Sequence, residues 1–147
     1  MAWFYGTYAC GHEGRVQIYG KVRDRQWKAD REFSKLCPEC WEKELQKRRE
    51  QENAEAAAKA AEMGLPELTG TPKQVAWANT LRQRLIDTYE EFFDRERRKQ
   101  RYNEKYGVNM DEVLEFILKN HTEASYYIDH RGWTLLEIIE ENIKKMR

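Results

Sequence analysis

This sequence lacks a surplus of either charge, and it lacks any long apolar run. Its 147 residues include 26 Lys and Arg and 26 Asp and Glu, so the formal net charge is zero. A neutral chain has no global field that would draw it to nucleic acid or to an anionic membrane, which leaves only local patches for such binding. No stretch approaches the roughly 20 apolar residues that span a bilayer, so we expect no membrane segment.

Cysteine is scarce, and its number is odd. Three cysteines do not make a complete disulfide framework, which argues against a secreted, disulfide-bonded fold. The first residues, Met1-Ala2-Trp3-Phe4-Tyr5, show neither the basic region nor the apolar run of a signal peptide. We therefore expect a cytoplasmic protein, in a compartment where closely spaced cysteines indicate a metal site more often than a disulfide.

Charged and aromatic residues, in contrast, are plentiful. Charged residues make up 35% of the chain and the mean hydropathy is −0.98, which predicts long solvated helices. Aromatic residues still reach 12%, which is too many for a disordered chain. The length gives room for one ordinary domain or two small ones.

The first 45 residues change from a strand pattern to a helical pattern. Two runs rich in aromatic and β-branched residues flank Cys10-Gly11-His12, which predicts a β-hairpin with this tripeptide in its turn. A helix is predicted after the hairpin, and another from Pro38 with Trp41 facing inward. The apolar stripe of the first helix comprises Val22, Ala29, Phe33 and Leu36.

Helical signals dominate the rest of the chain. Residues 46–63 are almost all Lys, Arg, Glu, Gln and Ala without a continuous apolar stripe, so we expect a solvated connecting helix, followed by a loop over 64–71. Thr71-Pro72-Lys73-Gln74 predicts a capping box at the start of a helix that loses its apolar stripe after Phe93 and ends at Gly107. Shorter helices are predicted to start at Asn109, Thr122 and Thr134, the first and last with capping boxes to Glu112 and Glu137.

Cys10, His12, Cys37 and Cys40 have the chemistry of a structural zinc site. Zinc favours thiolate and imidazole ligands in a tetrahedron, and structural sites are closed by four protein ligands. Two residues separate Cys37 from Cys40, which lets both sulfurs face one ion, and Gly11 allows Cys10 and His12 to form a second pair. A hairpin unit with little core needs such a clasp, because folding and metal binding are linked. We predict one structural Zn²⁺ ion.

Other interpretations of these residues stay open. The cysteines could be buried small hydrophobes, or Cys37 and Cys40 could form a redox pair that leaves Cys10 and His12 unexplained. The single residue between Cys10 and His12 is also shorter than the usual gap of about two to four. The fourth ligand could therefore be Glu13, His121, His130 or water instead of His12.

Three segments of the chain carry a resemblance to known proteins. They are Cys-Gly-His at 10–12 with Leu-Cys-x-x-Cys at 36–40, then Leu65–Ala78, and then Ala124–Arg131. In this order they resemble a poorly characterised group of bacterial, plasmid and phage proteins. The group has no established activity, so the resemblance implies an architecture and no reaction. Some members have Cys where this chain has Tyr8, which makes His12 more necessary as a ligand. A phage or plasmid setting would imply a role in the host cytoplasm, in handling host nucleic acid or blocking host defences.

The most basic stretch runs from Arg95 to Lys105. Lys and Arg can neutralise phosphates, and Tyr can stack on bases. Acidic residues are interleaved there, which suits ordinary ion pairs on a solvated helix as well. The candidate nucleic-acid-binding residues are Arg97, Arg98, Lys99, Arg101 and Tyr102.

Catalytic signatures are sparse. Asp129 and His130 are adjacent and point in different directions on a helix, so they do not make a dyad. Glu13 could act as a base only at a zinc ion with an open position, which four protein ligands would close. We assign no catalytic residue, and a zinc hydrolase stays an alternative. Because Tyr, Trp and Arg are common interface anchors, the candidate partner-binding residues are Trp27, Trp41, Tyr127 and Arg131.

Together these patterns predict an α+β protein in three segments. Residues 1–45 form a small treble-clef or ribbon-like zinc module, residues 46–71 a solvated helix and linker, and residues 72–147 a mainly helical domain. The expected function is a non-catalytic zinc-binding adaptor that binds a protein, such as a host nuclease or defence complex. The alternative is a zinc-dependent DNA- or RNA-binding protein that uses the basic stretch. The charge-paired helix also leaves a homodimer open.

Overall fold

The computed structural model describes residues 2–147; Met1, at which the predicted zinc module begins, lies outside the described residues. The chain forms two compact units whose boundary falls between Glu50 and Gln51, inside helix α2 (Pro38–Glu62). The first unit holds a two-stranded sheet and the second is helical, so the mixed fold predicted from the sequence is confirmed at this level. Within residues 2–147, no helix combines the length and the apolar character needed to cross a bilayer.

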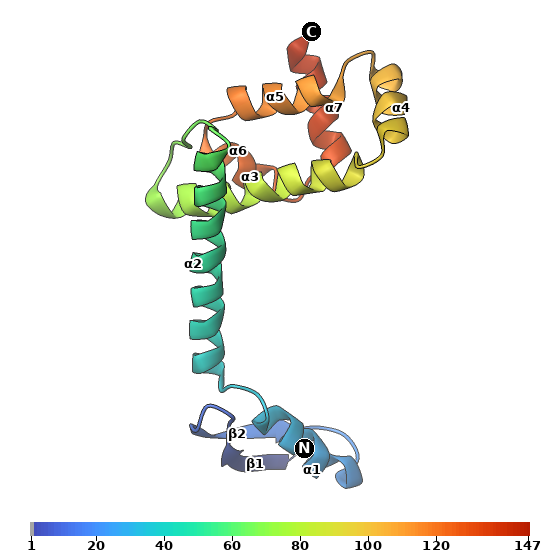
Figure 1. Ribbon diagram of the computed structural model, residues 1–147. Helices are drawn as coiled ribbons and strands as arrows, with labels where there is room; N and C mark the ends of the chain where they lie inside the picture. Colours follow the sequence, from blue (N-terminus) through green and yellow to red (C-terminus); the bar gives the residue numbers. More distant parts are fainter. Residues whose placement is uncertain (1) are drawn as a thin grey trace. The chain divides into compact units, whose positions relative to one another are not determined.

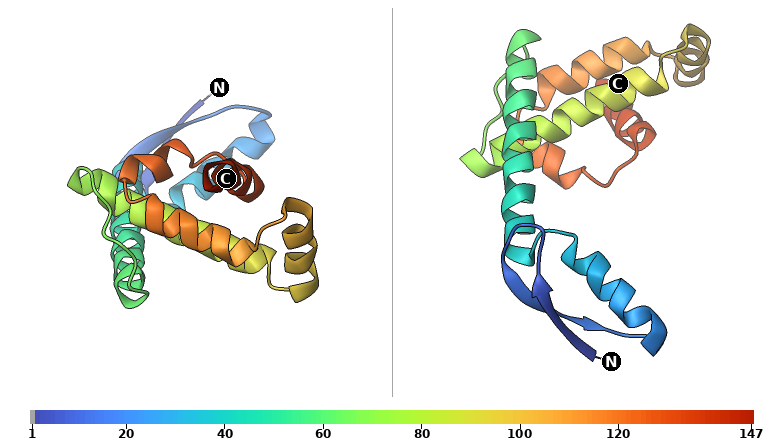
Figure 2. Two further views of the ribbon diagram at one scale, coloured as in Figure 1. Left: turned by 90° about the horizontal axis from the view of Figure 1, so that it is seen from above. Right: turned by 60° about the horizontal axis from the view of Figure 1, so that its bottom comes forward.

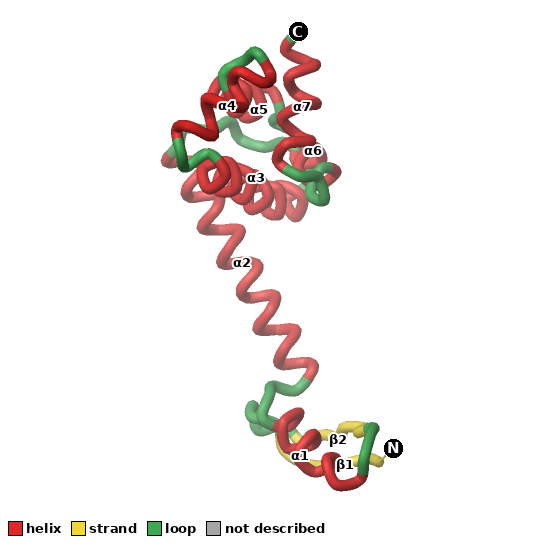
Figure 3. Tube along the Cα trace, turned by 90° about the vertical axis from the view of Figure 1, so that its right-hand side faces the viewer, coloured by secondary structure: helices red, strands yellow, loops and turns green. Residues whose placement is uncertain are grey.

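The first unit is built on the predicted hairpin. Strands β1 (Ala2–Thr7) and β2 (Glu13–Ile18) are antiparallel, and α1 (Val22–Phe33) packs against both of them (Figures 2 and 3). The register places Gly6 opposite Gly14, and both glycines make room for aromatic rings. A Cβ atom at Gly6 would lie 3.0 Å from the ring of Phe33, and one at Gly14 would lie 2.6 Å from Tyr8 Cε2.

The core of this unit is thin. Its buried apolar residues, among those described, are Ile18, Ala29 and Cys37. Val22 was predicted for the apolar stripe of α1 but is exposed, since the buried surface of the helix begins only at Ala29. So little buried apolar area cannot by itself offset the conformational entropy of some 50 ordered residues.

The helical unit contains the end of α2 and five further helices (Figure 1). Apolar side chains of α3, α5 and α7 supply most of its main core, which includes Tyr89, Met110, Val113, Ile117 and Ile139. α3 contacts α6 and α7, and α5 contacts α4 and α7. The five helices are α3 (Pro72–Phe92), α4 (Glu96–Tyr106), α5 (Met110–Asn120), α6 (Ala124–Asp129) and α7 (Leu135–Met146).

Two of the predicted capping boxes are confirmed, and two predicted helix starts differ. Thr71 and Thr134 each accept a hydrogen bond from the backbone N–H three residues on and receive the reciprocal side-chain bond. Asn109 caps α5 but accepts from Asp111 N–H instead of forming the box with Glu112. Thr122 does not cap α6, whose N-cap position is Glu123. The Thr122 carbonyl accepts instead from Thr69 N–H, in a short bridge between the 64–71 loop and the start of α6.

The helix predicted to continue from Pro72 to Gly107 is broken. α3 ends at Phe92 and α4 begins at Glu96. Phe93 leaves the helical conformation with φ −107° and is buried, with its ring 5.6 Å from that of Tyr102. One straight helix would hold Phe93 and Tyr102 on opposite sides. The break brings both aromatic residues into the same core.

The second half of α2 is packed, contrary to the predicted solvated helix. Ala56 and Ala60 are buried, and Asn53 accepts a hydrogen bond from Thr80 of α3 at 2.5 Å. Alanine adds little to an apolar stripe, so the sequence pattern did not show this face. In the first half of α2 no residue is buried, which explains why Trp41 is 52% exposed instead of facing inward.

Candidate metal centre

Cys10 and His12 lie in the turn of the hairpin. Gly11 N–H donates to Tyr8 O and Tyr8 N–H donates to His12 O, both at 2.9 Å, so the turn closes within five residues. Gly11 between them has φ +89°, a conformation that side chains disfavour. This glycine explains how a gap of one residue can present both ligands on the same side.

Cys37 and Cys40 lie at the start of α2, which Pro38 opens. The Cys40 N–H points at the Cys37 sulfur at 3.4 Å, and Trp41 N–H donates to Cys37 O at 2.8 Å. A backbone bond from Ala9 N–H to Lys35 O ties this turn to the hairpin turn. The two ligand pairs, 25 residues apart in sequence, thus meet in one place.

The four ligand atoms have the spacing of a metal site. All of them lie within 4.8 Å of one another. His12 Nδ1 lies 3.2 Å from Cys10 Sγ, 3.6 Å from Cys37 Sγ and 3.3 Å from Cys40 Sγ. Zinc–ligand bonds of tetrahedral sites give a nitrogen–sulfur edge of about 3.6 Å. Cys10, His12, Cys37 and Cys40 are therefore close enough to hold a metal ion.

Hydrogen bonds lower the pKa of one thiol of the group, and the neighbouring sulfur raises the pKa of another. Backbone N–H groups, first that of Cys37 and then that of His12, lower the pKa of Cys10 to about 6. The neighbouring Cys37 sulfur, together with burial, raises the pKa of Cys40 to about 11. A divalent cation between the sulfurs would offset this mutual repulsion and favour the thiolate form of each.

The geometry bears on the alternative ligands named from the sequence. The three cysteines are free thiols, and His12 belongs to the group of close ligands. His121 and His130, the alternative ligands, are engaged in the helical unit, with Nε2 atoms 2.6 Å from Asn142 Oδ1 and 3.1 Å from Glu141 Oε2. Three thiolates and one imidazole suit zinc well and suit hard cations such as Mg²⁺ poorly.

We expect replacement of Gly14 by alanine to weaken metal binding. The new methyl group would clash with the ring of Tyr8, the residue that closes the hairpin turn by two backbone bonds. Overpacking of this kind costs about 1–3 kcal/mol, which linkage converts into a roughly ten- to hundred-fold lower metal affinity. Competition with a chromophoric chelator measures this. Gly132→Ala is the control, because no atom lies within 4 Å of its added Cβ.

The basic stretch of the sequence forms most of α4, a helix in which no residue is buried. Lys99 pairs with Asp111 at 3.2 Å, and Arg98 donates to Phe92 O. The ring of Tyr102 is partly buried against Phe92 and Phe93. Arg97, Arg98 and Arg101 are exposed.

The four candidate partner-binding residues have different environments. Trp27 is exposed with the Arg31 guanidinium over its ring, and Trp41 is exposed on α2. Tyr127 is 4% exposed and its hydroxyl donates to His121 O. Its side chain is therefore part of the core and is not a surface anchor. Arg131 lies 5.5 Å from the ring of exposed Trp77.

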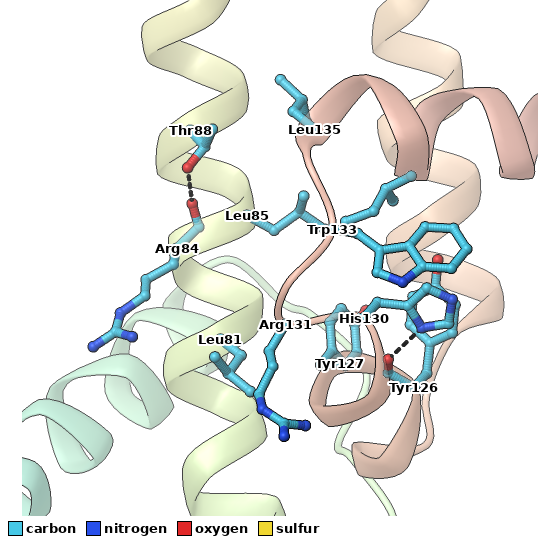
Figure 4. A pocket seen from close by; sticks show the side chains of 11 residues that line it. Leu81, Arg84, Leu85, Thr88, Tyr126, Tyr127, His130, Arg131, Trp133 and Leu135 are labelled. Atoms are coloured by element: carbon cyan, nitrogen blue, oxygen red, sulfur yellow. Dashed lines mark hydrogen bonds between the residues drawn. The ribbon is translucent and has the colours of Figure 1, made fainter.

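A groove between α3 and the α6–α7 connection was not predicted from the sequence. We call it the α3–α6 groove; it has a volume of about 170 Å³ (Figure 4). Leu81 and Leu85 of α3 form one wall. The rings of Tyr126, His130 and Trp133 form the other; the His130 ring is tilted against that of Tyr126, with centroids 4.2 Å apart, and meets that of Trp133 edge-on at 4.5 Å. The sequence signal was the spacing of Leu81, Arg84, Leu85 and Thr88 on one helical face.

Comparison with known proteins gives no match for this chain, whether to family models, to curated proteins or to solved structures.

Proposed function

We propose that this protein is a zinc-stabilised, non-catalytic interaction protein whose helical unit binds a protein partner. The observation that carries this proposal is the closed donor set. Cys10, His12, Cys37 and Cys40 supply four protein ligands around one position. A catalytic zinc needs an open position for water or substrate, so a hydrolase would require one of these four to be displaced.

The arrangement of the first unit supports a treble-clef-like zinc module. A ligand pair in a turn, a hairpin strand and a helix precede the second ligand pair at the start of another helix. With a thin core, the bonds to the metal would supply much of the folding free energy, as in small zinc domains generally.

The α3–α6 groove supports a protein partner. Its volume of about 170 Å³ is below the roughly 300–1,000 Å³ of small-ligand pockets, and a single side chain of a partner would fill it. Arg84 and Arg131 line it, and no carboxylate is found among its described lining residues. We therefore propose a partner segment with one large apolar side chain and neighbouring acidic residues. Trp133, 43% exposed at the rim, would be an anchor of the type that dominates interfaces.

The resemblance to bacterial, plasmid and phage proteins supports a setting for this partner. In the host cytoplasm, a nuclease or defence complex would be a target for a small adaptor of this kind. The alternative that α4 binds nucleic acid has less support, since its Tyr102 is packed and its Lys99 is paired, which leaves Arg97, Arg98 and Arg101 as its exposed cations.

Two measurements test the proposal. Cobalt substitution should give the spectrum of a closed site with three sulfur ligands and one nitrogen ligand; an exchangeable water ligand would contradict the non-catalytic assignment. Proteins captured from nuclease-treated host lysate should be lost with Trp133→Ala and Arg131→Gln but retained with Arg97→Gln, the matched change on α4. The reverse pattern, with loss on nuclease treatment, would favour the nucleic-acid alternative.

A further inference from the structure

The hairpin carries a second surface, separate from the α3–α6 groove. Side chains alternate along β1, so that Trp3 and Tyr5 point away from the face covered by α1 and are 48% and 75% exposed. Across the strands, Tyr5 pairs with Arg15 and Trp3 pairs with Gln17. We call these four residues, with Thr7 and Glu13, the hairpin face.

The aromatic rings of this surface lie beside cations. The guanidinium of Arg15 is 4.4 Å from the centroid of the Trp3 ring. Next to it, Tyr5, Arg15 and the backbone of Gly6 and Gly14 enclose an open hollow of about 560 Å³. Gly6 and Gly14 line the hollow with their backbone between the aromatic ring of Tyr5 and the charged side chain of Arg15.

Arg15 also lines a second open hollow, of about 610 Å³, which runs from β2 to α1. Trp27, Lys28 and Arg31 line its other side, and Arg31 lies 5.8 Å from the centroid of the Trp27 ring. The two hollows share Arg15, so they adjoin at that residue. We call the surface that they and the hairpin face make together the strip; it carries the exposed rings of Trp3, Tyr5 and Trp27 and the cations of Arg15, Lys28 and Arg31.

The charge of the units separates this strip from the rest of the chain. Residues 1–50 hold 11 Lys and Arg and 8 Asp and Glu, a net charge of +3, while residues 51–147 hold 15 and 18, a net charge of −3. The zero charge of the whole chain hides this asymmetry. Glu13, at the turn end of the hairpin face, and Glu32, in the second hollow, oppose it locally without reversing it.

We propose that this strip binds single-stranded nucleic acid. Trp3, Tyr5 and Trp27 would stack on bases, while Arg15, Lys28 and Arg31 would neutralise phosphates. Ring faces can stack only on bases that are unpaired, so duplexes would bind more weakly. Stacking is tolerant of sequence, and binding should therefore show little sequence preference.

The test uses the metal-loaded protein of 147 residues and dye-labelled strands of about 12 dT or rU nucleotides, with a duplex of the same length for comparison. Fluorescence anisotropy should show that Trp3→Ala and Tyr5→Ala each weaken binding about fivefold or more, as expected for one lost stacking contact. Arg15→Gln should lower the salt slope by about 0.7, the value for one phosphate contact on a single strand. Trp77→Ala is the matched control, since Trp77 is 43% exposed and also has an arginine over its ring.

Three outcomes would overturn the inference. Trp3→Ala could bind the strand as tightly as the wild type, Trp77→Ala could lose as much affinity as Trp3→Ala, or the duplex could bind as tightly as the single strand. A nuclease-resistant protein partner lost in Trp3→Ala, without oligonucleotide binding, would make the hairpin face a protein interface instead. Metal content is measured on every variant, so that this test can fail independently of the proposed function. A metal-loaded wild type that binds no strand would contradict only the nucleic-acid inference.

Discussion

Replacing Cys37 by serine is expected to abolish stoichiometric metal binding and to unfold the first unit. Cys37 is the buried ligand of the four, and its sulfur accepts the Cys40 N–H. Loss of a partner that merely orients a ligand lowers metal affinity 10- to 100-fold, so loss of the ligand itself should cost more than about 100-fold. With Ile18 and Ala29 as the remaining buried apolar residues described in this unit, the hairpin has little else to hold it.

Hydrogen exchange resolved by segment, together with metal analysis, measures this outcome. Amides of β1 and β2 should lose protection in Cys37→Ser, while those of α3, α5 and α7 keep it, because the helical unit has its own core. Glu13→Gln is the control, since it changes the carboxylate next to His12 and should leave metal content unchanged. A Cys37→Ser protein with one tightly bound ion and a protected hairpin would disprove the clasp.

The metal centre could be predicted from the sequence because its parts are local. Each ligand pair lies within a single turn: Cys10-Gly11-His12 in one, and Cys37 to Cys40 in the other. The turns that glycine and proline favour can be recognised from the sequence without knowledge of the fold. The capping boxes at Thr71 and Thr134 were predictable for the same reason.

Features that depend on a distant partner could not be predicted. Gly6 and Gly14 look like flexible points in a strand until Phe33 and Tyr8 are seen to fill the space beside them. The exposure of Trp41 could not be predicted, because the periodicity of the sequence does not show that the first half of α2 buries no residue.

The net charge of the whole chain did not predict the charge of its parts. The sum is zero, but the two units carry charges of +3 and −3. Electrostatic attraction acts over about 8–10 Å at physiological salt, so the charge of a unit matters more to a bound strand than the sum over 147 residues. The proposed nucleic-acid strip thus lies in the first unit, whereas the most basic run of sequence lies in the second.

Arg82→Ala is expected to destabilise the helical unit by about 3 kcal/mol. Arg82 is 2% exposed, and it donates to Pro66 O at 2.8 Å and to Asn79 Oδ1 at 3.2 Å. Burial lowers the pKa of its guanidinium, as expected for a cation held away from water. Truncation removes the buried stem and leaves the Pro66 carbonyl without its donor, which releases the 64–71 loop from α3.

Arg82→Met separates the two contributions. Methionine keeps most of the buried volume but donates no hydrogen bond, so its cost should be that of leaving the Pro66 carbonyl and the Asn79 Oδ1 atom without their donor, about 1–2 kcal/mol. Burying an unpaired charge is itself unfavourable, and removing that charge offsets part of the loss. Arg84→Ala, two residues along the same helix, is the matched control: it breaks only an exposed pair with Glu52, at 3.4 Å, and should cost less than about 1 kcal/mol.

Thermal unfolding followed by circular dichroism measures all three variants. For a unit of this size, 3 kcal/mol corresponds to a fall in Tm of about 12 °C or more. Equal shifts for Arg82→Ala and Arg84→Ala would show that the buried guanidinium does not hold the loop. A Met variant as unstable as the Ala variant would instead place the whole effect in the hydrogen bonds, because the two differ in packing and not in donors.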